Sequence, residues 1–107
     1  MTVRIKDREY DFSFDSIWGP IYTYEEIAGR KLPFDPQKTI CRHILFYCIL
    51  IRCNKDFTLP LDDFMKALDN LSLLRQMADY YNSRMEVLTA SDEDKVDHED
   101  GGDKKKD

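Results

Sequence analysis

Residues 37–53 read QKTICRHILFYCILIRC, and this stretch decides the fold. It follows Asp35-Pro36, which pairs an oxygen-bearing capping residue with a proline suited to the first helical position. Over its second half the predicted helix is apolar on almost every side. A helix of that composition is buried at the centre of a domain or contributes to a subunit interface, and both environments remain open at this point.

Upstream of this helix, the first fifteen residues alternate between apolar and polar side chains. Val3 and Ile5 alternate with charged residues. Tyr10, Phe12 and Phe14 alternate with polar residues. A period of two predicts a β-hairpin with one apolar face, although the turn lacks the Asn-Gly pair that would predict its type. A lone hairpin cannot bury three aromatic side chains, so we expect helices to pack against that face.

The segment between the hairpin and the central helix has helical spacing over residues 17–28. Ser16 can cap this helix, and Gly29 is a natural stop signal. Alternatively, Gly19 is the cap and Pro20 the first helical residue. The sequence does not decide between these two starts.

A short helix at residues 62–68 and a longer one at residues 71–88 complete the predicted fold, with Asp69 or Asn70 as the cap of the longer one. The last helix carries a heptad seam about two and a half repeats long. The seam consists of Leu71, Leu74, Ala78, Tyr81, Met85 and Leu88.

The seam and its neighbours form more apolar surface than one small core readily covers. Methionine and tyrosine together suit an adaptable protein-binding surface. We therefore hypothesise that the last helix binds another protein, with core packing as the open alternative. The residues of this hypothesis are Leu73, Leu74, Met77, Tyr80, Tyr81 and Met85.

Charge divides the chain at about Ala90. Residues 91–107 contain eight acidic and four basic residues, which accounts for −4 of the net charge of −5 and leaves about −1 for residues 1–90. Val96 is the one apolar residue among those seventeen, so we expect a disordered acidic tail there. The prediction is a single α+β domain at residues 1–90, an N-terminal β-hairpin packed on three to four α-helices, followed by this tail.

Cysteine and histidine spacing argues against a catalytic or metal site. Cys41 and Cys48 are seven residues apart on one helical face, Cys53 lies off that face, and no C-x-x-C pair exists. His43 is two residues from Cys41, and such positions do not share a face. We therefore expect no catalytic residue, no metal ligand and no cofactor, and we expect that the protein is not an enzyme.

The charge balance also limits the partners. A nearly neutral folded part lacks the basic patch that nucleic acid or an anionic membrane would require. The N-terminal residues alternate and lack the apolar core of a signal peptide, and no stretch is apolar enough to span a bilayer. We expect a cytoplasmic protein with reduced thiols, no nucleic acid and no membrane partner.

The order of elements resembles a known family. The first helix ends in the phrase YEEIAGR (residues 24–30), which is followed by Phe34, a strongly apolar helix and a final helix. Over roughly residues 1–90, this arrangement looks like the small tail assembly chaperones of long-tailed phages and prophages. The resemblance implies a protein of the host bacterial cytosol that binds the tape measure protein and keeps it soluble during tail assembly.

The resemblance has a further implication for the end of the chain. In this family a longer product often arises by ribosomal frameshifting, and the three lysines at 104–106 are candidates for an A-rich slippery codon run. The alternative function is a small regulatory adaptor or inhibitor that binds a host protein. A homo-oligomer would bury the central helix or the heptad seam, so self-association also remains open.

Overall fold

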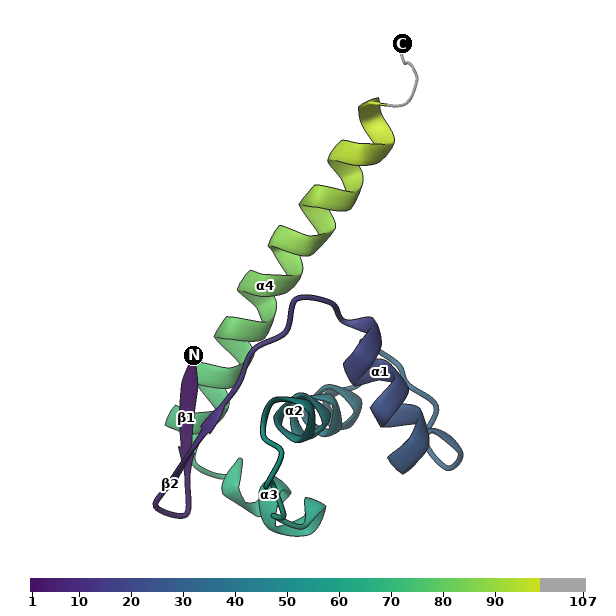
Figure 1. Ribbon diagram of the computed structural model, residues 1–107. Coiled ribbons are helices and arrows are strands. Elements are labelled where there is room, and N and C mark those ends of the chain that lie inside the picture. The colour runs from purple at the N-terminus through teal and green to yellow at the C-terminus, as the bar shows by residue number, and fades with distance from the viewer. Residues whose placement is uncertain (99–107) are drawn as a thin grey trace. The chain divides into compact units, whose positions relative to one another are not determined.

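The computed structural model describes the backbone of residues 1–98 and the side chains of residues 1–89. Packing divides the chain into two units, Met1–Met77 and Ala78–Asp107. The predicted α+β class is confirmed, because a two-stranded antiparallel hairpin is followed by helices α1 to α4 (Figure 1). The predicted division at about Ala90 stays a prediction, and its last part, residues 99–107, lies outside the described residues.

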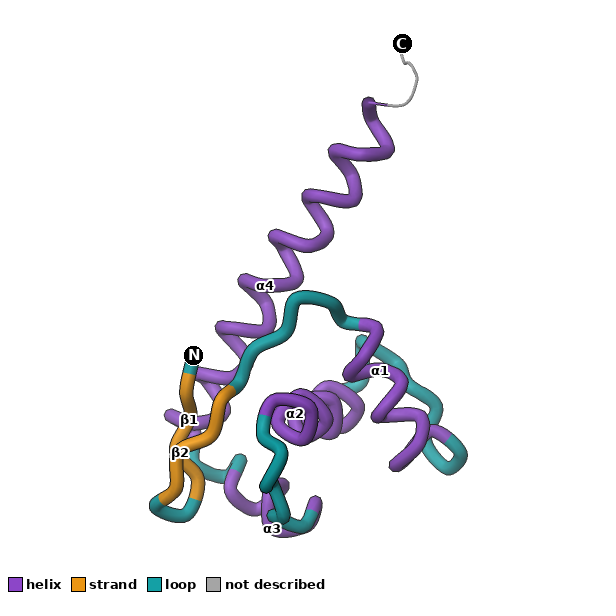
Figure 2. The backbone as a smooth tube through the Cα atoms, in the orientation of Figure 1, coloured by secondary structure: helices purple, strands orange, loops and turns teal. Residues whose placement is uncertain are grey.

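The hairpin joins β1 (Thr2–Ile5) to β2 (Arg8–Asp11), with Val3 opposite Tyr10 (Figure 2). The inward-facing side chains are buried, as the alternation predicts. The expectation that Phe12 and Phe14 lie in the second strand was wrong. The Phe12 N–H donates to the Met1 carbonyl at 2.8 Å, but the last pair of the ladder is Thr2 opposite Asp11, so β2 ends at Asp11. Both rings are nevertheless buried.

The turn of the hairpin consists of Lys6 and Asp7. Both have left-handed backbone conformations, with φ values of 51° and 65°. Two successive positive φ values in a two-residue loop correspond to a type I′ turn, whose twist matches that of the strands. The sequence did not reveal this turn because neither residue is the glycine or asparagine that usually occupies it.

The next helix changes its winding part-way. Helix α1 (Trp18–Tyr24) continues as the π-helix η1 (Glu25–Gly29). The Ser16 hydroxyl accepts a hydrogen bond from the Trp18 N–H at 3.3 Å, although Ile17 is the capping residue. Pro20 lies in the first turn, where its missing N–H costs no helical hydrogen bond. The helical segment ends close to the predicted position, but Gly29 is the last residue of η1 and Arg30 is the C-cap, so Gly29 is not the stop residue that was predicted. The π-helical segment was not predicted either.

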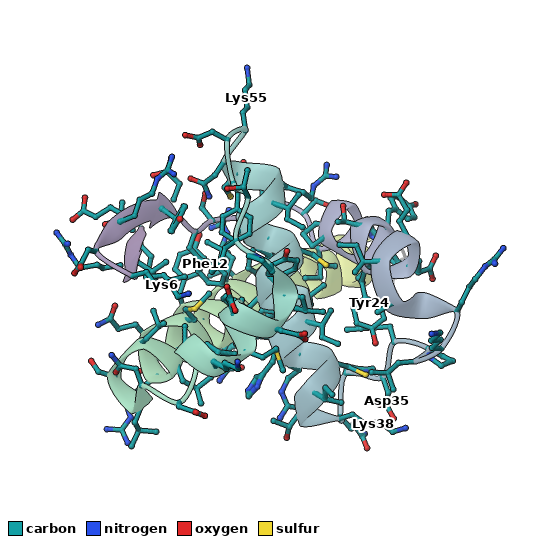
Figure 3. All side chains as sticks on the ribbon, turned by 90° about the horizontal axis from the view of Figure 1, so that it is seen from below. Lys6, Phe12, Tyr24, Asp35, Lys38 and Lys55 are labelled. Atoms are coloured by element: carbon teal, nitrogen blue, oxygen red, sulfur yellow. The ribbon has the colours of Figure 1, made fainter. Side chains whose placement is uncertain are left out.

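Helix α2 (Thr39–Cys53) is buried within the chain, which is one of the two environments left open by its sequence. It contacts α1, α3 and β2. It begins two residues later than predicted, because the Asp35 carboxylate accepts the Gln37 N–H at 2.9 Å in a turn that precedes the helix. Seen from below, the labelled side chains of Phe12 and Tyr24 lie on either side of this helix (Figure 3).

Helices α3 (Leu61–Ala67) and α4 (Leu71–His98) follow. Asn70 is the cap of α4, since its side-chain oxygen accepts hydrogen bonds from the Ser72 and Leu73 N–H groups at 3.0 and 3.3 Å. The last helix continues to His98 and does not end at Leu88, the predicted end. No glycine or proline interrupts the chain between these two residues, so the backbone meets no helix breaker there.

Candidate functional site

The residues predicted to bind a protein differ in their exposure. Leu73, Met77 and Tyr81 are buried, and Met77 has no exposed surface at all. Leu74, Tyr80 and Met85 are half-buried. The three buried positions are spaced four residues apart, so they lie along one face of α4. All six residues therefore lie on one helix, and Leu74, Tyr80 and Met85 are partly accessible to solvent.

The buried face of α4 does not follow the predicted heptad seam. Leu71, the first member of the seam, is 64% exposed, whereas Leu73 is buried. The side chains of Leu74, Met85 and Leu88 are half-buried. The buried residues Leu73, Met77 and Tyr81 follow at steps of four, whereas coiled-coil spacing alternates three and four.

Tyr24 is the largest of the fully buried side chains among the described residues, and its hydroxyl is hydrogen-bonded. It donates a hydrogen bond to the Leu32 carbonyl at 2.6 Å and lies 3.3 Å from the Cys41 sulfur. Burial and the neighbouring Cys41 thiol raise the pKa of Tyr24 well above its ordinary value. The ring also packs edge-on against Phe34, with centroids 5.2 Å apart. These contacts fix the loop after η1 against α1, so Tyr24 has a structural role.

The thiols of Cys41 and Cys48 and the imidazole of His43 are poorly placed for catalysis. Cys41 and Cys48 are fully buried, and burial raises the pKa of Cys48 to about 12. A thiol with such a pKa is not ionised near neutral pH and is a weak nucleophile. Burial of the imidazole is the main cause that lowers the pKa of His43, and the positive charge of Arg42 lowers it further. The imidazole ring packs near Phe46, with centroids 5.9 Å apart.

The described part of the chain offers neither a metal site nor a membrane span. Residues 1–89, whose side chains are placed, contain no group of three or more His, Cys, Asp or Glu side chains that could hold a metal ion. Among the helices that the structure describes, none combines the length and the apolar character needed to cross a membrane.

A second surface, on α1, was missed by the sequence analysis. Trp18 and Tyr22 are 62% and 63% exposed, although both are large aromatic residues. They are four residues apart, on the side of α1 opposite the buried Pro20, Thr23 and Tyr24. The signal was present in the sequence, because Trp18 and Tyr22 fall outside the apolar spacing of Ile17, Ile21 and Tyr24. Their exposure, however, follows only from the packing.

Hollows in the surface of the first unit lie beside these elements. One of about 420 Å³ is lined by Glu25, Gly29, Arg30, Pro33 and Phe34, and so adjoins η1. Another of about 360 Å³ is lined in part by Arg4, Lys6 and Lys66, with Lys6 and Asp63 forming an ion pair at 3.4 Å. The first hollow lies next to η1 in the chain segment that directly follows α1, because Glu25 and Gly29 of η1 line it.

Comparisons with known proteins add no family to this description. A scan against protein-family models, a search of curated proteins and a search of solved structures each found no match to the chain. The function therefore has to be argued from the chain itself.

Proposed function

We propose that this protein is a tail assembly chaperone of a long-tailed phage or prophage, which binds the tape measure protein in the host bacterial cytosol and keeps it soluble. The proposed role is binding and not catalysis. Its starting point is the resemblance in the order of elements and in the YEEIAGR phrase at residues 24–30. The buried, un-ionised thiol of Cys48 supports a non-enzymatic role.

The observation that carries the proposal is the partly accessible apolar surface of α4. Leu74, Tyr80, Met85 and Leu88 are half-buried, and Val87 is 54% exposed. A helix of 28 residues is about 42 Å long, which is enough to lie along several turns of a helical partner. Methionine and tyrosine adapt to partners of varied surface, as a protein that coats a long helical chain requires.

Co-expression with a helical fragment of a tape measure protein tests this proposal. The variants are Met85→Asp and Val87→Asp, which place a charge on accessible apolar positions. The matched controls are Asn82→Asp and Ser83→Asp, because these exposed positions on the same helix gain the same charge without losing apolar surface. We expect the first pair to leave the fragment insoluble and the controls to keep it soluble, with unchanged circular dichroism throughout.

Two results would contradict the proposal. The first is that the wild-type protein fails to solubilise the fragment. The second is that all four variants solubilise it equally. The second result would exclude the accessible face of α4 as the binding surface. The alternative, an adaptor or inhibitor of a host protein, predicts no effect on the tape measure fragment.

A further inference from the structure

We infer that the outer face of α1 and η1 is a second docking surface, whose occupant is a cationic amphipathic helix of another protein. This face, named here the Trp18 face, consists of Trp18, Tyr22, Glu25 and Glu26, with the hollow at Gly29 and Phe34 at its end. It is a different surface from α4. Its test requires no tape measure protein, so it stands or falls separately from the proposed function.

The first step concerns the aromatic pair. Trp18 and Tyr22 are each more than 60% exposed, and they lie one turn apart on a helix. Tryptophan and tyrosine are enriched at the energetic centres of protein interfaces, because each offers a large, rigid apolar area with one polar group. Core packing does not require these two side chains, since Pro20, Thr23 and Tyr24 form the buried side of α1.

The second step concerns charge. Glu25 and Glu26 begin η1 and are exposed, and neither carboxylate has an ion-pair partner among the described side chains. Arg30, at the rim of the adjoining hollow, contributes one positive charge. Glu25, Glu26 and Arg30 together carry a net charge of −1 beside the aromatic pair. The Arg52 guanidinium donates to the Thr23 hydroxyl on the buried side of α1. A helix with lysine or arginine next to its apolar side chains matches both features.

The third step concerns geometry. The chain is wound as a π-helix from Glu25, so the side chains of η1 depart from the α-helical spacing of α1. Ile27 is itself 44% exposed. A cation placed over the Trp18 ring gains a cation–π interaction, and indole is the best of the aromatic rings for it. Apolar anchors of the partner would then enter the hollow lined by Pro33 and Phe34.

The experiment uses the full chain and two synthetic helical peptides of about 18 residues with the same leucine pattern. One carries lysine on its polar face and the other carries glutamate. Trp18 is the single tryptophan in the sequence, so its fluorescence reports on this face alone. We expect the leucine–lysine peptide to cause a saturable blue shift and to protect Trp18 from acrylamide quenching. The leucine–glutamate peptide should do neither.

Charge-reversal variants locate the site. We expect Glu25→Lys with Glu26→Lys to weaken binding of the leucine–lysine peptide at least tenfold. The matched control, Glu9→Lys with Asp69→Lys, changes the same charge at exposed positions on β2 and before α4, and should alter the affinity less than twofold. Circular dichroism of both variants checks that the fold is kept.

Three outcomes would overturn the inference. The first is a Trp18 emission that neither peptide changes. The second is an equal shift of this emission with the two peptides. The third is an equal loss of affinity for the leucine–lysine peptide in both double variants.

Discussion

The side chain of Asn54 pairs with the backbone of Asp11 in the way that a neighbouring strand would. The Asn54 Oδ1 accepts the Asp11 N–H at 3.0 Å, and the Asn54 Nδ2 donates to the Asp11 carbonyl at 2.9 Å. The same Nδ2 also donates to the Leu50 carbonyl in the last turn of α2, at 2.9 Å. One amide therefore joins the edge of the hairpin to the end of the central helix.

Loss of this amide should destabilise the fold. In Asn54→Ala, the Asp11 N–H and carbonyl lose their partner, whereas the Leu50 carbonyl keeps its hydrogen bond from the backbone N–H of residue 54. We expect the free energy of unfolding to fall by about 1 kcal/mol. Urea denaturation followed by circular dichroism measures the change. The control is Asn82→Ala at an exposed position of α4, which should stay within about 0.5 kcal/mol of wild type. Equal effects in the two variants would show that the Asn54 contacts do not stabilise the fold.

Substitutions in the hairpin turn should instead raise the stability of the fold. Lys6 and Asp7 occupy left-handed conformations that cost about 1–2 kcal/mol for ordinary side chains. The double variant Lys6→Asn with Asp7→Gly supplies the asparagine–glycine pair that is preferred in a type I′ turn. We expect it to stabilise the fold by about 1 kcal/mol, because the left-handed conformations then cost less, and the midpoint of thermal unfolding should rise.

The variant also loses the ion pair between Lys6 and Asp63, which is well exposed and contributes little. Asp63→Asn removes this ion pair without altering the turn, so it measures that loss separately. A lower midpoint for the turn variant than for Asp63→Asn would contradict the assigned turn type.

Alkaline pH should reveal the burial of Cys48. Burial raises its pKa from the ordinary 9.0 to about 12, so the thiol of the unfolded chain loses its proton first as the pH rises. The stability that this group contributes is complete below about pH 9 and is lost progressively between about pH 9 and about pH 12. The loss is at most about 1.4 kcal/mol per pH unit.

Denaturation of wild type and Cys48→Ala at a series of pH values isolates this contribution. Tyr24 and Tyr47 are present in both proteins, but the Cys48 thiolate also raises their pKa values, so the difference measures Cys48 together with its effect on these two tyrosines. We expect wild type to lose stability more steeply than Cys48→Ala once the pH exceeds the ordinary pKa of a thiol. Parallel curves would show that the thiol is not buried in solution.

Two positions of α4 should differ in their response to truncation. Met77 is fully buried in the first unit, so Met77→Ala should cost about 2–5 kcal/mol. Leu71 is 64% exposed, and Leu71→Ala should cost less than about 0.5 kcal/mol. If α4 packed by the heptad seam, Leu71→Ala would be the costlier of the two in a denaturant titration.

Deletion of all residues after Ala90 tests the predicted division of the chain. This stretch has one apolar residue in seventeen, so it offers little surface for packing. We expect the midpoint of thermal unfolding to stay within about 1 °C of wild type in differential scanning calorimetry, because about 1 kcal/mol corresponds to several degrees in a domain of this size. A large drop would place the domain boundary beyond Ala90.

The local elements of the fold were predictable because their signals are periodic. The alternation of Val3, Ile5 and Tyr10 predicted the hairpin, and Asn70 was one of two predicted caps for the last helix. The π-helical winding of η1 was not predictable, since no residue type specifies it. The end of β2 at Asp11 was not predictable from residues 12–14, because it depends on which residue of β1 pairs with Asp11.

The sequence likewise predicted some features of the candidate surfaces and left others undetermined. The sequence identified α4 as apolar, but it did not separate Met77, which is buried, from Met85, which is half-buried. It placed Trp18 and Tyr22 outside the apolar spacing of the first helix, but their exposure followed only from the packing. Exposure depends on which face of each helix meets its neighbour, and hydrophobic spacing leaves that face uncertain by one position or more.

The sequence by itself determined the α+β class, the central helix at about residues 37–53 and the concentration of negative charge after Ala90. These follow from periodicity and composition, which act locally along the chain. Only the tertiary structure decided that Asn54 joins Asp11 to α2, that Leu73 and Met77 face the core, and that Trp18 and Tyr22 face solvent. These depend on contacts between residues distant in sequence, whose geometry exists only once the elements have packed.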